Sequence, residues 1–575
     1  MIKLLRFIKP YRLLIGLVFI LVFLQSLANL YLPTLMADII DTGIVKGDTP
    51  YILRIGGLML LVTIGGAICA IIASFYSAKI AIGFGRIVRG KLFTHVENFS
   101  LHEFDKMGTA SLITRTTNDT TQVQQVLIII LNMMISAPLM AIGGIILAVA
   151  QDATLSLILL AAIPFLVAAI LLIMFRAIPL FQAMQKKIDR LNLILDEELT
   201  GVRVIRAFDR IEKERRRFAD ANLDLTDTAI KVNRIVAFLM PIMMLVLNIS
   251  TVAILWFGSI RINNGDMQLG ALFAFLQYSM QILFAFLMLS MMFIMLPRAA
   301  ASATRINEVL AMEPEINDPE NPEQTGTLRG HVEFDNVTFS YPGAEEPALA
   351  NISFRASPGQ VTAIIGGTGS GKSTLISLLP RFYDIDSGHV YIDGVDTRDM
   401  SQESLRAKIG FVPQKAVLFS GTITDNIRYG NLEASDEEIY QAAEVAQATE
   451  FISEMKDGYD SIIAQGGTNV SGGQKQRLSI ARALIRRPEI YVFDDSFSAL
   501  DFKTDAKLRA ALRSQTTDAT VFIVAQRVGT VMDADQIIVL DEGHLAGIGT
   551  HRELMETSEV YREIVSSQLS MEEIA

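Results

Sequence analysis

Six long stretches of apolar residues without a charged side chain dominate the N-terminal part of the chain. Each is long enough to cross a hydrocarbon layer of ~30 Å as a helix, which rises about 1.5 Å per residue. A single stretch of this kind also fits a buried helix of a large soluble core, but six in succession predict membrane spans. The six stretches are Leu13–Pro33, Ile55–Ala78, Val126–Ala150, Ala153–Phe175, Ile235–Trp256 and Leu272–Leu296.

The connections between these stretches differ in length. Only Gln151 and Asp152 separate the third stretch from the fourth, which predicts a tight hairpin. Residues 79–125 and 176–234 are long connections, and in residues 181–234 the apolar positions follow a helical spacing. We therefore expect each long connection to be a helical hairpin that extends the spans. Candidate tips are Leu101–Lys106 (LHEFDK) and Val204–Asp209 (VIRAFD), where composition alone fits a solvated turn equally well.

Lysine and arginine residues are concentrated in the segment before the first stretch and in the two long connections. The other three connections hold only Lys46, Arg54 and Arg261. Positively charged loops favour the cytoplasmic side, so we expect a cytoplasmic N-terminus and a cytoplasmic chain after the sixth span. The first apolar run is long and no convincing small-residue cleavage site follows it, which argues against a removable signal peptide. These features predict a multi-pass protein of the plasma membrane.

The pattern changes after Leu296. Residues 312–327 contain three prolines with acidic and small polar residues and no apolar period, which is typical of a linker. From residue 328 onward, short β-branched runs alternate with helical stretches, the pattern of an α/β domain. The sequence thus predicts a multidomain protein, with a six-helix transmembrane domain over 1–311, a linker over 312–327 and an α/β domain over 328–575.

Composition supports a membrane protein and narrows its partners. Of the 575 residues, 51% are hydrophobic and 19% charged, which is more apolar than a soluble chain of this length requires. The net charge of −11 argues against a nucleic-acid partner. Cys69 is the only cysteine, so an intrachain disulfide and a cysteine-rich metal site are both excluded.

The segment GGTGSGKST lies between an apolar β-branched run, Val361–Ile365, and a helix-forming stretch, Leu375–Leu379. A glycine-rich backbone can direct successive N–H groups at phosphate oxygens, as in a P-loop. Lys372 then reaches the β- and γ-phosphates and the Ser373 hydroxyl ligates Mg²⁺. A plain glycine-rich turn is the alternative, which the flanking strand and helix disfavour. The expected ATP-binding residues of this loop are Gly366, Gly367, Thr368, Gly369, Ser370, Gly371, Lys372, Ser373 and Thr374.

A second motif, VSGGQ, stands directly before a helix rich in lysine and arginine. A helix N-terminus of this kind favours an anion. One chain cannot direct two such termini at a single γ-phosphate, so this motif needs a separate explanation. Its residues are Ser471, Gly472, Gly473 and Gln474.

Polar residues follow several of the strand-like runs. Asp494 and Asp495 end the run Ile490–Phe493, where their carboxylates are placed for a metal and for a water. Gln526 follows the run at 521–524, and SALD (498–501) lies between the two runs. Two further residues are weak evidence for a nucleotide site when each is taken alone. Tyr341 is better explained as a strand-end tyrosine, and a lone glutamine such as Gln414 indicates almost nothing.

Together these motifs resemble the ATP-binding cassette transporters of exporter type, in which a six-helix membrane domain precedes the cassette. The resemblance covers essentially the whole chain. It implies that Tyr341 stacks on adenine, and that Gln414 senses the γ-phosphate and joins Ser373 and Asp494 at Mg²⁺. The two hairpin tips match the coupling helices that dock on cassettes. It also implies head-to-tail closure of two cassettes, with VSGGQ facing the partner's ATP and Asp501 on a loop that crosses the interface.

Two residues depart from the family pattern. The residue after Asp494 is usually glutamate, which polarises the attacking water, and here it is Asp495. The family's switch histidine is replaced by Gln526, which can form hydrogen bonds but cannot become a cation. Aspartate withdraws the carboxylate by roughly 1 Å, a displacement that can cost ~10²-fold in rate. We therefore expect Asp495 and Gln526 to form a slow catalytic site, and the chain to pair with a related subunit that carries the intact glutamate.

The resemblance implies an ATPase coupled to transmembrane transport, with ATP and Mg²⁺ as cofactors. The spans contain no charge, so the expected cargo is apolar or amphipathic and the expected function is multidrug-type export. Lipid or peptide export and an ATP-gated channel or regulatory subunit are the alternatives. An importer is disfavoured because its membrane and cassette parts are usually separate chains. The sixth span offers aromatic and thioether side chains at Phe273, Phe275, Tyr278, Met280, Phe284, Phe286, Met288, Met291, Met292, Phe293 and Met295.

Overall fold

The computed structural model of the chain describes residues 2–568, apart from the side chains of residues 2, 290, 291, 293 and 294. The side chains of Met291 and Phe293 in the sixth span therefore lie outside the described residues. The chain forms two compact units. One consists of Met1–Glu97 and Ala110–Met312, and the other of Asn98–Thr109 and Glu313–Ala575.

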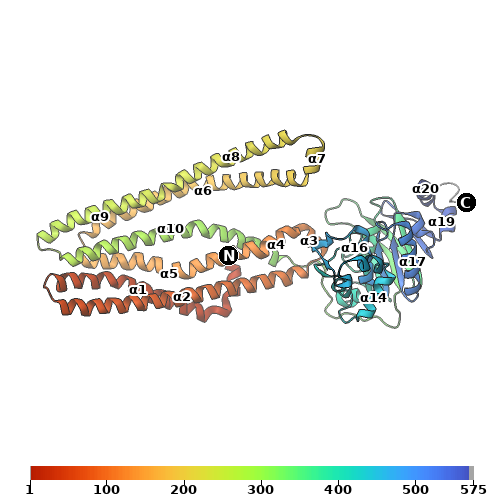
Figure 1. Cartoon of the computed structure of the whole chain (residues 1–575), viewed down its shortest axis with the longest axis horizontal. Helices are drawn as coiled ribbons and strands as arrows, with labels where there is room; N and C mark the ends of the chain where they lie inside the picture. Colours follow the sequence, from red (N-terminus) through yellow and green to blue (C-terminus); the bar gives the residue numbers. More distant parts are fainter. Residues whose placement is uncertain (1, 569–575) are drawn as a thin grey trace. The chain divides into compact units, whose positions relative to one another are not determined.

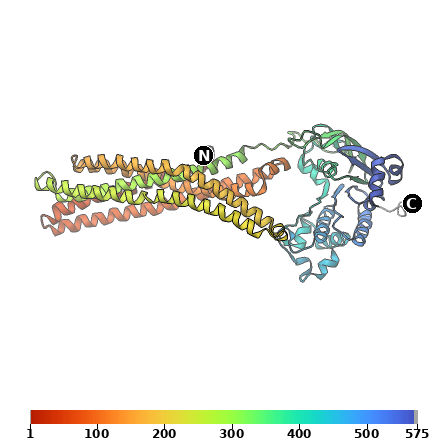
Figure 2. The ribbon, with the colours of Figure 1, turned by 90° about the horizontal axis from the view of Figure 1, so that it is seen from above.

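The first unit is built from long helices that run side by side in both views (Figures 1 and 2). Six segments of the described chain are long and apolar enough to cross a membrane, which confirms the six expected spans. They are Lys3–Ile44, Thr49–Glu97, Thr109–Gln151, Ser156–Thr200, Ile211–Asn263 and Leu269–Leu289. The long helices are α1 (Arg12–Asp38), α2 (Thr49–Glu97), α5 (Thr120–Gln151), α6 (Ser156–Thr200), α8 (Ile211–Ala237), α9 (Leu239–Asn263) and α10 (Leu269–Ala311).

The tight hairpin between the third and fourth spans is present. Helix α5 ends at Gln151 and α6 begins at Ser156. The carboxylate of Asp152 holds the turn, because Oδ1 accepts the backbone N–H of Leu155 at 2.9 Å and Oδ2 pairs with Nε of Arg261 at 2.7 Å. Arg261 lies near the end of α9, so this ion pair also joins the turn to a third helix.

Both long connections contain a short helix at the expected tip. Helix α3 (Leu101–Met107) follows α2, and α7 (Val202–Ala207) lies between α6 and α8 at the end of that helical hairpin (Figure 1). Ser100 and Glu103 form a capping box at the start of α3. Glu103 is buried, and its second carboxylate oxygen accepts the backbone N–H of Glu315 at 3.2 Å. This bond joins two parts of the second compact unit, Asn98–Thr109 and the chain after Glu313.

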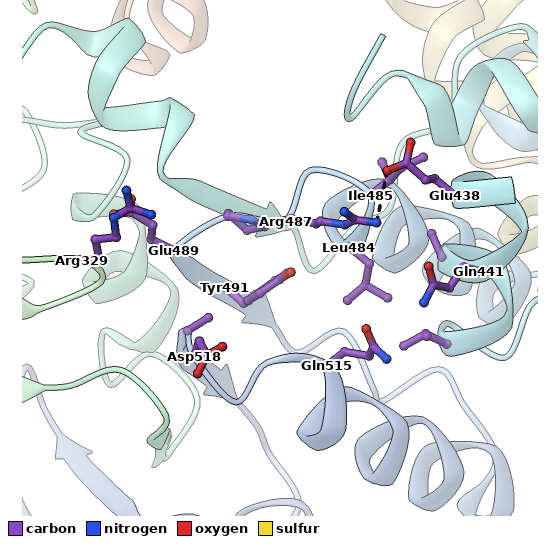
Figure 3. A pocket seen from close by; sticks show the side chains of 14 residues that line it. Arg329, Glu438, Gln441, Leu484, Ile485, Arg487, Glu489, Tyr491, Gln515 and Asp518 are labelled. Atoms are coloured by element: carbon purple, nitrogen blue, oxygen red, sulfur yellow. Dashed lines mark ion pairs between the residues drawn. The ribbon is translucent and has the colours of Figure 1, made fainter. Parts of the chain in front are cut away.

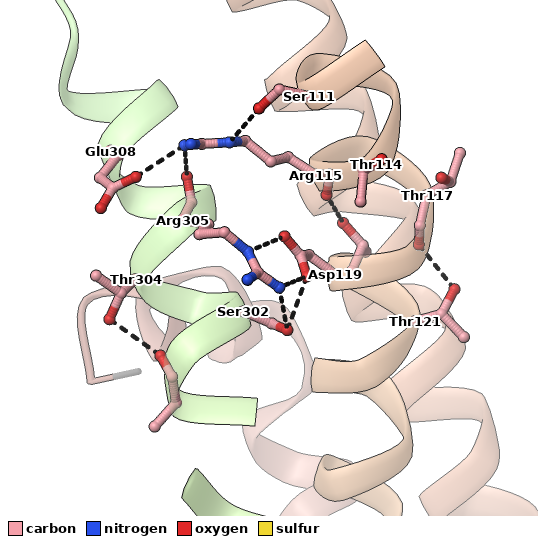
Figure 4. Close-up of polar contacts among 12 residues, drawn as sticks. Ser111, Thr114, Arg115, Thr117, Asp119, Thr121, Ser302, Thr304, Arg305 and Glu308 are labelled. Carbon is pink, nitrogen blue, oxygen red and sulfur yellow. Dashed lines mark hydrogen bonds and ion pairs between the residues drawn. The ribbon is translucent and has the colours of Figure 1, made fainter. Parts of the chain in front are cut away.

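A cluster of polar side chains joins α10 to the start of α5 (Figure 4). A single π-helical turn, η3 (Arg115–Asp119), precedes α5 and ends at the buried carboxylate of Asp119. Ser302 donates to Asp119 Oδ1 at 2.8 Å, and Arg305 binds both carboxylate oxygens, one through Nε at 2.7 Å. Arg115 reaches back to Glu308 at 2.9 Å. We name Arg115, Asp119, Ser302, Arg305 and Glu308 the α5–α10 clamp.

The described residues of the second unit form three sheets. The strand order in the largest is β12-β11-β3-β10-β9-β6, in which only β12 runs antiparallel. Its strands are β3 (Val361–Gly366), β6 (Ile409–Val412), β9 (Ile490–Asp494), β10 (Thr520–Val524), β11 (Gln536–Asp541) and β12 (His544–Gly549). A four-stranded antiparallel sheet comprises β1 (Val332–Phe339), β2 (Leu349–Ala356), β4 (Ser387–Ile392) and β5 (Val395–Asp396), and the third pairs β7 (Gly421–Thr422) with β8 (Ile462–Ile463).

Apolar cores cover both faces of the six-stranded sheet. Successive residues of β3 alternate between them, with Ile364 in one core and Ala363 and Ile365 in the other. All residues of β9 and β10 are buried, which explains their continuous apolar sequence. The surrounding helices are α11 (Lys372–Leu378), α12 (Gln402–Ala407), α13 (Ile423–Arg428), α14 (Asp436–Val445), α15 (Thr449–Glu454), α16 (Gly472–Leu484), α17 (Phe502–Gln515), α18 (Val528–Val531), α19 (His551–Thr557) and α20 (Glu559–Gln568).

Candidate ATP site

The polar residues that follow the strands meet at one edge of the six-stranded sheet. Strands β3, β10 and β9 are parallel neighbours, and Val524 of β10 pairs with Ile364 on one side and with Asp494 on the other. Their carboxyl ends therefore lie together. The loop after β3, the aspartates at the end of β9 and Gln526 after β10 share this edge, which is where open α/β sheets bind ligands.

The loop after β3 has a backbone that other residues would not tolerate. Gly369 and Gly371 have φ values of 84° and 94°. At Gly371 a Cβ would also lie 2.8 Å from the carbonyl oxygen of Ala348. The turn that leads into α11 thus requires glycine, and it forms a cradle of backbone N–H groups suited to phosphate.

Lys372 lies across this loop. Its Nζ donates to the carbonyl oxygens of Gly366 at 3.0 Å and Gly367 at 2.5 Å. Burial lowers the pKa of Lys372, and the charges of Asp495 and Asp494 oppose that shift. The ammonium group is held by weak neutral acceptors, so a phosphate would be a stronger partner for it.

Ser373 and Asp494 form the pair expected for a metal. The Ser373 hydroxyl donates to Asp494 Oδ1 at 2.9 Å. Burial raises the pKa of the Asp494 carboxyl, and repulsion by Asp495 adds to the rise. No cluster of three or more His, Cys, Asp or Glu side chains suited to a metal occurs within the described chain. One carboxylate and one hydroxyl fit Mg²⁺, which usually takes its other ligands from water and phosphate.

Two glutamine side chains hold Asp495. Its Oδ2 accepts the amide N–H of Gln526 at 2.9 Å and that of Gln414 at 3.2 Å. Asp495 is buried and has a φ of 45°, a left-handed conformation that is uncommon outside glycine. Gln414 was expected at Mg²⁺ beside Ser373 and Asp494, but in this structure its amide is directed to Asp495.

Gln476 is a further member of this network that the motifs did not single out. It is buried on α16, and its amide donates to the backbone carbonyl of Gln414 at 2.6 Å. The sequence could have indicated Gln476 as a polar residue on the buried face of the helix, four residues before the buried Ile480. Through this bond α16 supports the position of Gln414.

Tyr341 lies beside the phosphate loop. Its hydroxyl is 2.9 Å from Oγ1 of Thr374, and its ring stands edge-on to Phe339 and Tyr383 at centroid distances of 5.0 and 5.4 Å. The side chain remains 39% exposed. A ring face is thus available for stacking next to the loop, and adenine stacking stays a prediction.

The VSGGQ motif forms the start of α16. Ser471 caps the helix by accepting the N–H of Gln474 at 3.3 Å, and the Gln474 side chain accepts the N–H of Ser471 at 2.8 Å. A Cβ at Gly473 would lie 3.1 Å from the carbonyl oxygen of Ala499, so the motif lies directly against the SALD loop. Asp501 ends that loop and caps α17 by accepting the N–H of Thr504 at 3.0 Å. The motif and the loop therefore form one surface.

A cavity of about 540 Å³ lies between α14, α16 and α17 (Figure 3). No residue of the phosphate loop, of VSGGQ or of SALD lines it. Tyr491 of β9 lies within it, and burial raises the pKa of this tyrosine to about 12. At its rim Arg487 pairs with Glu438 at 3.2 Å. The motifs gave no indication of this cavity.

Comparison with known proteins decides the family. Residues 15–286 match the model of the ABC transporter transmembrane region, and residues 349–498 match the ABC transporter model. An uncharacterized ABC transporter ATP-binding protein of Mycobacterium tuberculosis is 46% identical over 98% of this chain and 97% of its own length. The chain belongs to the ABC transporter family.

Two further relatives describe the architecture of this ABC transporter. A fatty acid ABC transporter ATP-binding/permease protein of Mycobacterium bovis is 35% identical over 81% of this chain and 73% of its own length. The structure of a bacterial Atm1-family ABC exporter with ATP bound superposes with a TM-score of 0.82, at 26% identity, over 97% of this chain and 99% of that chain. The chain is thus a multi-pass membrane protein with an exporter fold and an ATPase coupled to transport, as its motifs implied.

Proposed function

We propose that the chain is one half of a heterodimeric ABC exporter that moves apolar or amphipathic compounds out of the cell. Its own ATP site is slow, and the partner carries the intact catalytic glutamate. The observation that carries this proposal is the carboxylate of Asp495, one oxygen of which accepts hydrogen bonds from both Gln526 and Gln414.

These two bonds oppose catalysis at Asp495. A general base must have a free lone pair within reach of the water, and the two N–H donors occupy Oδ2 of this carboxylate. The shorter side chain adds a displacement of roughly 1 Å relative to glutamate. Gln526 is neutral, so it contributes no cation toward the γ-phosphate. Binding of ATP is preserved at Lys372 while its hydrolysis is slow.

The remaining residues take roles that suit such a half-transporter. Tyr341 stacks on adenine, and Ser373 and Asp494 hold Mg²⁺. Ser471 and Asp501 face the partner's nucleotide, on the surface where VSGGQ meets the SALD loop. The cassette and the N-terminus lie in the cytoplasm, and the spans cross the plasma membrane.

The cargo follows from the spans. Their apolar stretches contain no ionic side chain, so a strongly charged substrate would lack a buried partner. The relative named as a fatty acid transporter supports a cargo with a long apolar chain, and says nothing of the head group that this chain would accept. Export of many unrelated compounds and export of lipids or peptides are both compatible with this class.

The test is to purify the chain alone and together with its partner, and to measure ATP turnover and ATP-dependent uptake into inverted vesicles. We expect little turnover by the chain alone and transport by the pair. In the pair, Asp495→Glu together with Gln526→His should raise hydrolysis at this chain's site by up to ~10²-fold. Asp518→Glu, at the opposite end of the sheet, is the matched control.

Two results would overturn the proposal. One is vigorous transport by the wild-type chain alone, and the other is a partner that carries the same two substitutions. Uptake that continues without hydrolysis and collapses with the substrate gradient would instead indicate an ATP-gated channel.

A further inference from the structure

A cavity of about 340 Å³ lies among α1, α5 and α10 of the membrane unit. Three carboxamide side chains line it, those of Gln25 and Asn29 on α1 and Gln281 on α10. Gln25 and Gln281 each lie near the middle of a charge-free stretch. The helices therefore bring uncharged polar groups together where the surrounding residues are apolar.

The hydrogen-bonding capacity of these carboxamides is largely unused. The amide N–H of Gln281 donates to the carbonyl oxygen of Asn29 at 3.1 Å, but its buried Oε1 has no partner. The side chains of Gln25 and Asn29 form no hydrogen bond with any other described residue. The two serines that line the cavity do have hydrogen-bond partners. The hydroxyls of Ser26 and Ser136 donate to the backbone carbonyl oxygens of Val22 and Asn132 on their own helices, each at 2.8 Å.

Unpaired amides are costly in an apolar setting. Burying one without a hydrogen bond costs roughly 1–3 kcal/mol by protein measurements, and polar groups inside membrane spans commonly mark substrate paths. Gln281 Oε1 is such a buried unpaired atom, and the half-buried carboxamides of Gln25 and Asn29 line the same cavity. Helix packing does not account for the three groups, since Tyr278, whose hydroxyl bonds Thr34 at 2.7 Å, already joins α1 and α10. They are explained by a ligand that completes their hydrogen bonds.

The lining also sets the charge of that ligand. None of the described residues that line the cavity is acidic or basic. A cationic group would find no carboxylate, and a carboxylate group would find no cation. A carboxamide both donates and accepts, so it matches a group that does the same. The rest of the wall includes Met140, Met280, Met288 and Phe284, which form an adaptable surface for an apolar chain.

We infer that this cavity binds the transported compound, and that the compound is an amphipath with an uncharged amide or hydroxyl group. The inference rests on the proposed export function, which supplies the apolar cargo. It narrows that cargo, because hydrophobic cations and ionised fatty acids of the same length are excluded from tight binding.

The test uses four compounds with the same twelve-carbon chain: dodecanamide, dodecanol, dodecanoate and dodecyltrimethylammonium. Binding of labelled dodecanamide to the full-length chain with its partner in nanodiscs is measured after subtraction of empty nanodiscs. The other three compounds serve as competitors. Dodecanamide and dodecanol should bind at least about tenfold more tightly than the two charged compounds, as expected for the loss of one buried hydrogen bond.

Gln281→Met and Asn29→Leu keep the side-chain volume nearly constant and remove the amide. Each should weaken dodecanamide binding by about tenfold and leave the weak binding of the charged compounds unchanged. Ser279→Ala on the same helix is the control, because its hydroxyl donates to Phe275 of its own helix at 2.8 Å. Two variants on different helices keep the test decisive if one of them does not fold.

Equal affinity for the charged compounds would overturn the inference, as would unchanged binding in both variants. Selectivity that is present in detergent and lost in nanodiscs would assign the cavity to a bilayer lipid and overturn the inference too. ATP-dependent uptake into inverted vesicles separates the two proposals. Selective binding without uptake contradicts the export function and leaves the site standing, whereas uptake of charged and uncharged compounds alike contradicts only the site.

Discussion

Two adjacent aspartates show how neighbours assign different chemistry to the same residue type. Asp494 ends a buried strand and accepts the hydroxyl of Ser373, which suits a metal ligand. Asp495 turns away in a left-handed conformation and is held by the amides of Gln414 and Gln526. The sequence could assign Asp494 from its place after an apolar run. It could not reveal the two amide bonds, which depend on strands β6 and β10 lying on either side of β9.

Removing the Lys372 ammonium should abolish nucleotide binding at this chain's own site. In Lys372→Ala the phosphates lose a charge-assisted partner in a partly desolvated loop, and transport should stop. Protection of the chain by ATP against heat or protease measures the loss directly. Lys507→Ala is a suitable control, because this exposed lysine lies on α17, outside the phosphate loop and the VSGGQ motif. Unchanged ATP protection and transport in Lys372→Ala would refute the assignment of the loop.

The raised pKa of Asp494 predicts how Mg²⁺ binding depends on pH. Burial and the charge of Asp495 favour the protonated acid, so the carboxylate that ligates the metal is lost as pH falls through a value above the usual range. As the pH is lowered, Mg²⁺-dependent ATP binding should therefore begin to weaken at a higher pH than an ordinary aspartate would give. Asp495→Asn removes the like charge, lowers the pKa of Asp494 and should shift this weakening to lower pH. Titration of Mg²⁺ affinity against pH checks both; a shift to higher pH would contradict the argument.

Helices and strands could be predicted where the pattern of apolar and polar residues within one segment is enough to define them. The six charge-free stretches gave the spans, and the tight turn at Asp152 followed from the two residues between two of them. The short helices α3 and α7 fell at the expected tips. The π-helical turn at Arg115–Asp119 gave no sequence signal, and its last residue bonds Ser302 of the distant helix α10. The carboxamide cavity was hidden for the same reason, since three distant helices must pack before it exists.

The α5–α10 clamp should contribute measurably to stability. Asp119 is buried and binds Arg305 through both carboxylate oxygens, so Asp119→Asn removes charge-assisted bonds while the side-chain volume is kept. Because Arg305 is about half exposed, we expect the free energy of unfolding to fall by only roughly 1–3 kcal/mol. Unfolding of the purified protein in detergent measures this change. Glu212→Gln breaks a largely exposed ion pair with Arg215 and should have no measurable effect. An equal effect of the two substitutions would contradict the role of the clamp.

At the scale of the whole molecule, the proposed function assigns this cassette ATP binding with slow hydrolysis, while its VSGGQ motif matches the family pattern. Ser471 retains its helix cap, and Gly473 packs against the SALD loop. In the proposed head-to-tail dimer, the phosphate loop and the VSGGQ surface of one cassette serve different nucleotides. Asp495 and Gln526 depart from the family pattern, whereas the VSGGQ motif does not. Pairing with an unlike subunit would explain this combination, because the VSGGQ surface would then serve the competent ATP site of the partner.

This asymmetry predicts opposite results for the two nucleotides of the pair. Ser471→Arg places a bulky cation in the VSGGQ surface, so vanadate-trapped nucleotide should disappear from the partner chain and turnover should fall to background. Photolabelling by azido-ATP without hydrolysis should persist on this chain, because its own phosphate loop is untouched. Ser435→Arg is the matched control, since Ser435 forms the same capping box with Glu438 on α14 outside the motif. If trapping is lost equally from both chains, the two sites are equivalent and the heterodimer proposal fails.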